Sequence, residues 1–169
     1  MLSTFDRALI RLNRWAVIAI LAAMAVMVFA NVALRFLTDH SIVWVEEVSR
    51  YLMIWLTFLG AGLVLRYGGH IGIDTLQNAF PRHAAAVRVT IYALLLVFFA
   101  IMLWLGSRYA MLTWGQTTPV MQIPIGVVYL AIPFGFGLLI VHLVLMTIPY
   151  LRLGQFLADA EFDADAAKL

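Results

Sequence analysis

The sequence contains no cysteine, which excludes disulfide bonds, thiolate metal sites and cysteine nucleophiles together. Charge is also scarce: 12% of the residues are charged, whereas 64% are hydrophobic, and the mean hydropathy is +0.99. The formal net charge of +2 is too small to favour nucleic acid as a partner. These values lie far outside the range of soluble globular domains and predict an integral membrane protein embedded in the lipid bilayer.

Patterns that carry chemistry are missing as well. The sequence has no glycine-rich phosphate loop, no metal-spaced cluster, no nucleophile with a plausible base and no internal repeat. At 169 residues the chain forms one domain, too small for the repeated halves from which most self-sufficient secondary transporters are built. We therefore expect a protein that is not an enzyme and that holds no cofactor or metal.

Four apolar segments are long enough to cross a membrane as helices. The predicted spans cover about 15–36, 46–66, 88–109 and 124–150. Together they predict an all-α transmembrane domain over residues 1–152, followed by an acidic, disordered cytoplasmic tail over 153–169. Arg88 and Arg108 bracket the third span, and their long side chains can reach opposite interfaces. Pro133 lies in the fourth span and predicts a kink there.

The second span is unusual because its uncharged part is too short. Tyr51–Leu65 gives about 15 residues, roughly 22 Å of helix, against a hydrocarbon core of about 30 Å. The helix must therefore begin near Glu46, which brings Glu46, Glu47 and Arg50 to the membrane boundary. Charges at that depth are costly and need partners.

Helical spacing offers such partners. Glu46 and Arg50 are spaced i,i+4, and Glu47 and Arg50 are spaced i,i+3, so either pair can meet, and Arg35 at the end of the first span can take the other carboxylate. One interpretation is an ion-pair cluster that makes a helix end tolerable among lipid headgroups. The other is a lock between the first two spans that also presents Trp44 and a glutamate to a partner protein.

The arginines predict the orientation in the membrane. Cytoplasmic segments carry an excess of basic residues, so both termini and the central loop are predicted to be cytoplasmic. The residues behind this prediction are Arg7, Arg11, Arg14, Arg66, Arg82, Arg88 and Arg152. The segment Thr113–Ile123 has no charge and is predicted to face outward, as are Arg35 and Arg50.

The N-terminus shows a two-sided helical pattern. Apolar and charged side chains alternate at helical spacing, which predicts a short amphipathic helix on the inner membrane surface. The apolar side consists of Leu2, Phe5, Leu9 and Leu12, and the charged side of Asp6, Arg7, Arg11 and Arg14.

Three further polar residues leave alternatives open. His70 and Asp74 are four residues apart and form either a loop cap or, less simply, a ligand pair. His142 lies inside the fourth span without a second histidine at a matching depth. A buried, hydrogen-bonded histidine is the simpler interpretation, and a haem ligand or proton relay is the alternative.

Several of these motifs occur in an order that resembles a known family. After Arg35 come WVEEVSRYLMIWLTFLGAG from Trp44, HIGID from His70 and TPVMQIPIGVVYLAIPFG from Thr118, which includes Pro119 and Pro124. This order and spacing is similar to the small membrane subunit, the Q-type or DctQ-like subunit, of tripartite ATP-independent periplasmic (TRAP) transporters. The resemblance covers roughly residues 14–149.

The resemblance implies a non-catalytic, multi-pass subunit of the bacterial inner membrane. In that family a large membrane subunit holds the substrate and sodium sites, and a periplasmic substrate-binding protein delivers an organic acid. The small subunit is similar to a static brace for the large one and offers part of the docking surface for the binding protein. A chain without a charged site at the bilayer midplane fits that role.

Two other classes stay open on the residues alone. A membrane-anchor subunit of a cytochrome-type redox complex would also be a small four-helix protein, but it should carry histidines at facing depths, and only His142 is deeply placed. A self-sufficient homodimeric transporter would need a central carboxylate, whereas Glu46 and Glu47 lie at the edge. The sequence does not name a substrate.

Overall fold

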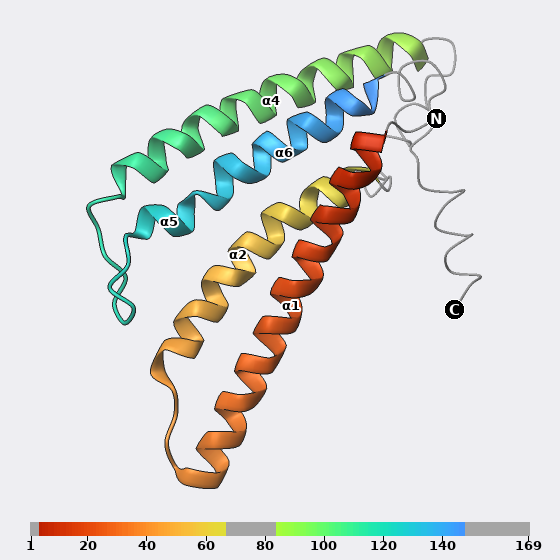
Figure 1. Ribbon diagram of the computed structural model, residues 1–169. Helices are drawn as coiled ribbons and strands as arrows, with labels where there is room; N and C mark the ends of the chain where they lie inside the picture. Colours follow the sequence, from red (N-terminus) through yellow and green to blue (C-terminus); the bar gives the residue numbers. More distant parts are fainter. Residues whose placement is uncertain (1–3, 67–83, 148–169) are drawn as a thin grey trace, which may run out of the picture.

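The computed structural model describes residues 4–66 and 84–147. Its regular structure there is helical, apart from an isolated bridge between Thr117 and Pro124. The helices are α1 (Thr4–Thr38), α2 (Val43–Arg66), α4 (Ala84–Leu112), α5 (Ile125–Tyr129) and α6 (Ala131–Leu145) (Figure 1).

Within the described residues, four helical segments are long and apolar enough to cross a membrane, which confirms the predicted all-α membrane fold. They are Thr4–Thr38, Val43–Arg66, Ala85–Leu112 and Ile125–Leu145. The second begins three residues before the predicted Glu46, so the charged turn lies inside the helix, as the length argument requires.

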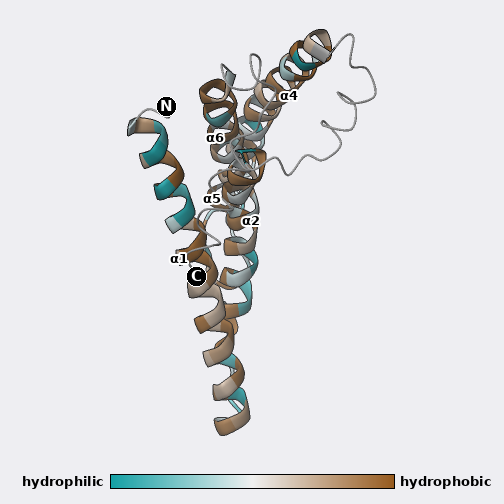
Figure 2. Cartoon of the chain, turned by 90° about the vertical axis from the view of Figure 1, so that its right-hand side faces the viewer, coloured by the Kyte–Doolittle hydropathy of each residue, from teal (hydrophilic) through white to brown (hydrophobic). Residues whose placement is uncertain are grey.

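A separate amphipathic helix at the N-terminus is not found in the described part of the chain. Residues 4–14 instead form the first turns of α1, a continuous helix of 35 residues. Figure 2 shows these turns as the hydrophilic end of a helix that is otherwise hydrophobic. The prediction of a separate helix was wrong because these turns continue directly into the first span and are tied to the neighbouring helices: Asp6 and Asn13 are buried, whereas Arg7, Arg11 and Arg14 are exposed.

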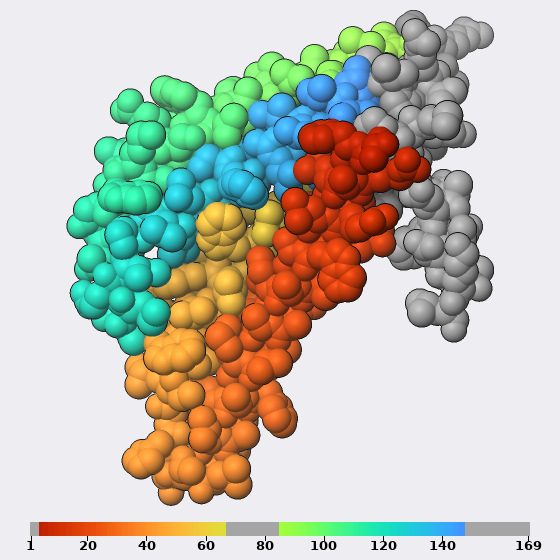
Figure 3. Space-filling view, viewed as in Figure 1, coloured from red at the N-terminus to blue at the C-terminus, as the bar shows by residue number. Residues whose placement is uncertain are grey.

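The four spans form an open layer rather than a closed bundle. Helix α2 packs against α1 on one side and α6 on the other, and α6 packs against α4. Figure 3 shows the helices as successive bands in the order α1, α2, α6 and α4. Within the most apolar part of the fourth span, Ile125–Leu145, 44% of residues are buried, whereas the figure for α1 is 6%. Most of the apolar surface is therefore available to lipid or to a partner.

The core lies where α2, α4 and α6 meet. Phe136 of α6 packs within 5.9 Å of the rings of Phe58, Phe98 and Phe99, measured between ring centroids. Leu65, Leu139 and Leu143 extend this core toward the other end of the layer; all three are buried.

The fourth span is interrupted between α5 and α6 at Leu130. Pro133 lies one turn further on and has no N–H, so the carbonyl of Tyr129 loses its helical partner, which accounts for the predicted kink. On the α5 side, a Cβ on Gly126 would lie 2.6 Å from the carbonyl oxygen of Ala110. Glycine is thus required for the close approach of α5 to α4.

Candidate functional site

At one end of the layer, Glu47 joins α2 to the loop between α4 and α5. Its carboxylate accepts hydrogen bonds from the backbone N–H groups of Val120, at 2.8 Å, and Met121, at 3.2 Å. The residue is 1% exposed. The side chains of Thr118 and Tyr51 also lie against this carboxylate. A buried carboxylate is thereby satisfied mainly by peptide dipoles rather than by an opposite charge.

The loop that Glu47 holds is a compact turn. Thr118 is fully buried, and its backbone N–H donates to the carbonyl of Ile123 at 2.9 Å. Gln122 adopts a positive φ of 54°, and its side-chain amide donates to the carbonyl of Pro119 at 3.0 Å. Pro124 precedes α5 as its N-cap residue. The two prolines predicted as interaction residues therefore lie within one ordered loop.

The predicted ion-pair cluster is not found. Within the described residues, no ion pair joins Arg35, Glu46, Glu47 or Arg50. Glu46, Arg50 and Arg35 are exposed, and the guanidinium carbon of Arg35 lies 5.9 Å from the ring centroid of Phe36. Local spacing predicted pairing, but the chain brings backbone donors from a distant loop to Glu47 instead. Trp44 is 42% exposed at the same end.

Asn31 organises the connection between α1 and α2. It is the one polar residue within the apolar part of the first span, and its side-chain oxygen accepts from the backbone N–H of Ile42 at 2.6 Å. The side chain thus ties the turn before α2 back to α1, a few residues before the charged turn that contains Glu47.

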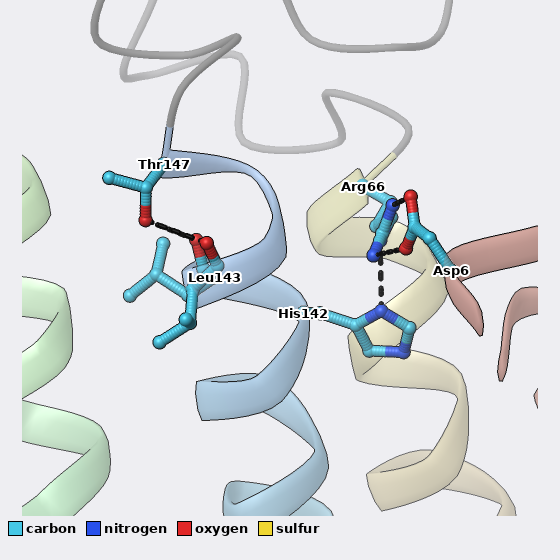
Figure 4. A network of polar contacts seen from close by, with 6 residues as sticks. Asp6, Arg66, His142, Leu143 and Thr147 are labelled. Carbon is cyan, nitrogen blue, oxygen red and sulfur yellow. Dashed lines mark hydrogen bonds and ion pairs between the residues drawn. The ribbon is translucent and has the colours of Figure 1, made fainter. Parts of the chain in front are cut away.

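The opposite end of the layer carries a polar cluster of Asp6, Arg66 and His142, which we call the three-helix cluster (Figure 4). Arg66, at the end of α2, binds the Asp6 carboxylate of α1 through both terminal nitrogens, one of them at 2.9 Å. Its Nε donates to Nδ1 of His142 on α6, also at 2.9 Å. All three side chains are buried. The cluster thus neutralises Arg66 and fastens three helices together.

The histidine of this cluster is held in one protonation state by geometry. Nδ1 accepts from a guanidinium, so the ring is neutral and its proton is on Nε2. Nε2 faces Gly62, where an added Cβ would lie 3.1 Å from it. Beside it, Asn13 of α1 donates to the carbonyl of Leu59 at 3.0 Å. This confirms the prediction of a buried, hydrogen-bonded histidine.

Two predicted site residues, His70 and Asp74, lie outside the described residues, as does the acidic tail 153–169. Over 4–66 and 84–147, no group of three or more histidine, aspartate or glutamate side chains is placed to hold a metal ion.

Both polar sites join helices to one another, and neither lies near the middle of a span. In a comparison with protein families, residues 24–152 match the family described as tripartite ATP-independent periplasmic transporters, DctQ component. The chain belongs to the DctQ family.

Curated relatives agree with this membership. A chain of Haemophilus influenzae named as a TRAP transporter small permease protein is 35% identical over 115 residues, which cover 68% of this chain and 71% of that one. The ectoine TRAP transporter small permease protein TeaB of Halomonas elongata is 29% identical over 140 residues, with 80% of this DctQ chain and 72% of TeaB covered.

A third relative has a different size. The isethionate TRAP transporter permease protein DctMQ of Oleidesulfovibrio alaskensis is 31% identical over 104 residues, which are 60% of this chain but only 16% of DctMQ. The part of DctMQ that is similar to this DctQ chain is therefore joined to a much longer polypeptide.

Sequence reasoning missed the three-helix cluster. The sequence predicts Arg66 as a topology signal and Asp6 as part of a surface helix, and neither pattern predicts that the two meet. The arginine pattern predicts that this end of the layer faces the cytoplasm. Two features pointed to the cluster: a histidine inside an apolar span, and an arginine one residue beyond the apolar run of another span.

Proposed function

We propose that this chain is the small scaffold subunit of a TRAP-type secondary transporter in the bacterial inner membrane. It braces a large permease subunit and helps to dock a periplasmic binding protein during sodium-gradient-driven uptake of an organic acid. Both termini face the cytoplasm in this proposal.

The observation that carries the bracing role is the open layer of helices. Only a small part of the apolar surface is buried between the chain's own helices. The rest is available for packing against another protein, and such packing drives the association of helices in a membrane. Exposed large side chains occur on every span, among them Phe29, Met53, Trp104 and Phe134. The fused relative supports a larger polypeptide as the partner, because its DctQ-like part is one segment of a long permease chain.

The internal contacts support a rigid brace. The three-helix cluster fastens α1, α2 and α6 at one end, and Glu47 fastens the α4–α5 loop to α2 at the other. Each hairpin is therefore tied to the other at both ends of the layer. A support against which another domain moves needs this kind of fixed geometry.

The docking role rests on the loop held by Glu47 and on its surroundings. The uncharged loop predicts that this end faces the periplasm. Its exposed residues include Pro119, Val120, Met121 and Gln122. The exposed charges of Arg35, Glu46 and Arg50 lie at the outer ends of α1 and α2. An ordered loop next to unpaired charges of both signs suits recognition of a soluble protein.

Reconstitution tests this function directly. The purified chain, the large permease subunit of the same organism and its binding protein are placed in liposomes with an inward sodium gradient, and uptake of labelled organic acids is measured. We expect uptake only when all three components are present. Uptake without this chain would contradict the scaffold role, and uptake by this chain alone would favour a self-sufficient transporter. A haem absorption band in the purified chain would instead favour the redox-anchor alternative.

A further inference from the structure

A groove on the exposed side of α4 has a positive charge at its mouth. It has a volume of about 370 Å³ and lies between α4 and the start of α6. Its lining is apolar except for Arg108 and the hydroxyl of Tyr109, and consists of Met102, Leu105, Gly106, Arg108, Tyr109, Leu112 and Ile132.

The cation at this groove lacks a protein partner. Over the described residues, Arg108 makes no hydrogen bond and no ion pair, and it is exposed. The loop that follows α4 has no charge from Thr113 to Ile123, so no neighbouring residue of that loop can neutralise it. A cation at a membrane boundary is best satisfied by an anionic lipid headgroup.

The length of the groove fits one leaflet. From Met102 to Leu112 the lining covers ten residue steps along α4, roughly 15 Å, which is half of a hydrocarbon core of about 30 Å. Arg108 and Tyr109 lie toward the loop end, and the ring of Tyr109 packs edge-on against Tyr129 at 4.8 Å between centroids. Tyrosine side chains are enriched at the headgroup boundary of membranes.

A second groove on α4 provides a contrast. From α4 its lining includes Ser107, Ala110 and Met111, which lie on the opposite side of the helix by the step of about 100° between residues, and no charged side chain lines it. Lipid chains and partner side chains would suit that groove equally. The groove at Arg108 differs from it by a positive charge, which favours an anionic lipid headgroup.

We propose that this groove is a binding site for one anionic phospholipid, with the phosphate on Arg108 and an acyl chain along Leu105 and Ile132 toward Met102. Gly106 brings α4 so close to α6 that an added Cβ would lie 2.6 Å from Ile132, and this contact closes the floor of the groove. The proposal does not depend on the transport role.

Native mass spectrometry of the full chain, released from detergent with added phosphatidylglycerol or phosphatidylcholine, tests the site. We expect one retained phosphatidylglycerol, and we expect Arg108→Gln to lower its retention roughly fivefold, the factor for about 1 kcal/mol per basic residue at an anionic lipid surface. Arg108→Lys should keep most of the binding. Arg35→Gln, which removes an exposed arginine away from the groove, is the matched control and should change nothing.

The groove itself is tested by Leu105→Trp, which fills the groove without changing the charge and should lower the retention of phosphatidylglycerol. Equal losses in Arg108→Gln and Arg35→Gln would mean unspecific attraction and would overturn the site. Displacement of the lipid by inorganic phosphate would mean that the site binds the headgroup alone and not the acyl chain. This result would also overturn the proposal. The same holds if Arg108→Gln leaves the retention of phosphatidylglycerol intact.

Discussion

Glu47 and its neighbour Glu46 show how burial separates two identical side chains. Both lie in the first turns of α2, but Glu47 faces inward and accepts two backbone hydrogen bonds, whereas Glu46 is exposed. The spacing of Glu46, Glu47 and Arg50 is compatible with ion pairs, so local pattern alone predicts the wrong partners. The true donors are more than 70 residues away in the sequence, and only the folded chain brings them to Glu47.

Replacing each glutamate with alanine tests this difference. Glu47→Ala removes the acceptor for the N–H groups of Val120 and Met121, so the loop should open more often. We expect hydrogen exchange at these two amides to quicken on the order of tenfold or more. Glu46→Ala is the control and should leave exchange unchanged. Equal effects of the two changes would mean that charge at this end matters more than the hydrogen bonds to the loop.

In the three-helix cluster, a buried charge depends on its partner. Removing one member of a buried ion pair leaves an uncompensated charge, which costs on the order of 3–5 kcal/mol. Arg66 is 1% exposed and depends on Asp6 for neutralisation. A basic residue at the end of a span normally indicates topology, and this general rule does not predict the structural role of Arg66.

At the scale of helices, contact between α2 and α6 depends on which glycine faces the partner. Gly60 of α2 faces open space, with no atom within 4 Å of an added Cβ. Gly62 is the contact residue, because an added Cβ would lie 2.7 Å from Cδ2 of His142. Small residues at helix interfaces allow this kind of close packing in membranes.

Paired alanine substitutions separate the two glycines. Gly62→Ala should force His142 away from Arg66 and destabilise the chain by about 1–3 kcal/mol, the usual cost of overpacking. Gly60→Ala should be neutral or stabilise by up to roughly 1 kcal/mol, since alanine is the better helix former. The measurement is thermal unfolding in mild detergent, followed by circular dichroism. A loss of stability in Gly60→Ala as large as in Gly62→Ala would contradict the assigned helix contact.

The element pattern itself was largely accessible from the sequence, for a clear physical reason. Span length is set by bilayer thickness, so the apolar runs and the short second segment together predict four helices and the early start of α2. The sequence did not predict that α1 is continuous, because an amphipathic pattern predicts a helix but not the residues that pack against its polar side. The order of helices in the layer depends on side-chain contacts such as Gly62 with His142, which periodicity does not reveal.

At the scale of the whole molecule, the four spans of the described residues place the start of α1 and the end of α6 on one side of the layer. The three-helix cluster shows this directly, since Asp6 near the start of α1, Arg66 at the end of α2 and His142 in α6 meet at one end of the layer. Which side of the membrane this end faces is a separate matter. The arginines that flank this end predict the cytoplasm.

Reporter fusions test that orientation. A reporter that is active only in the periplasm should give no signal when fused after Leu169 and a strong signal when inserted at Gly115, in the uncharged loop. Gly115 suits the insertion because it is exposed and has no atom within 4 Å of an added Cβ. A reporter that is active only in the cytoplasm should give the reverse pattern at the same two sites. Periplasmic activity at both sites would mean an odd number of spans, and exchanged signals would mean that the layer is inverted; in that case the loop held by Glu47 would face the cytoplasm and could not meet a periplasmic binding protein.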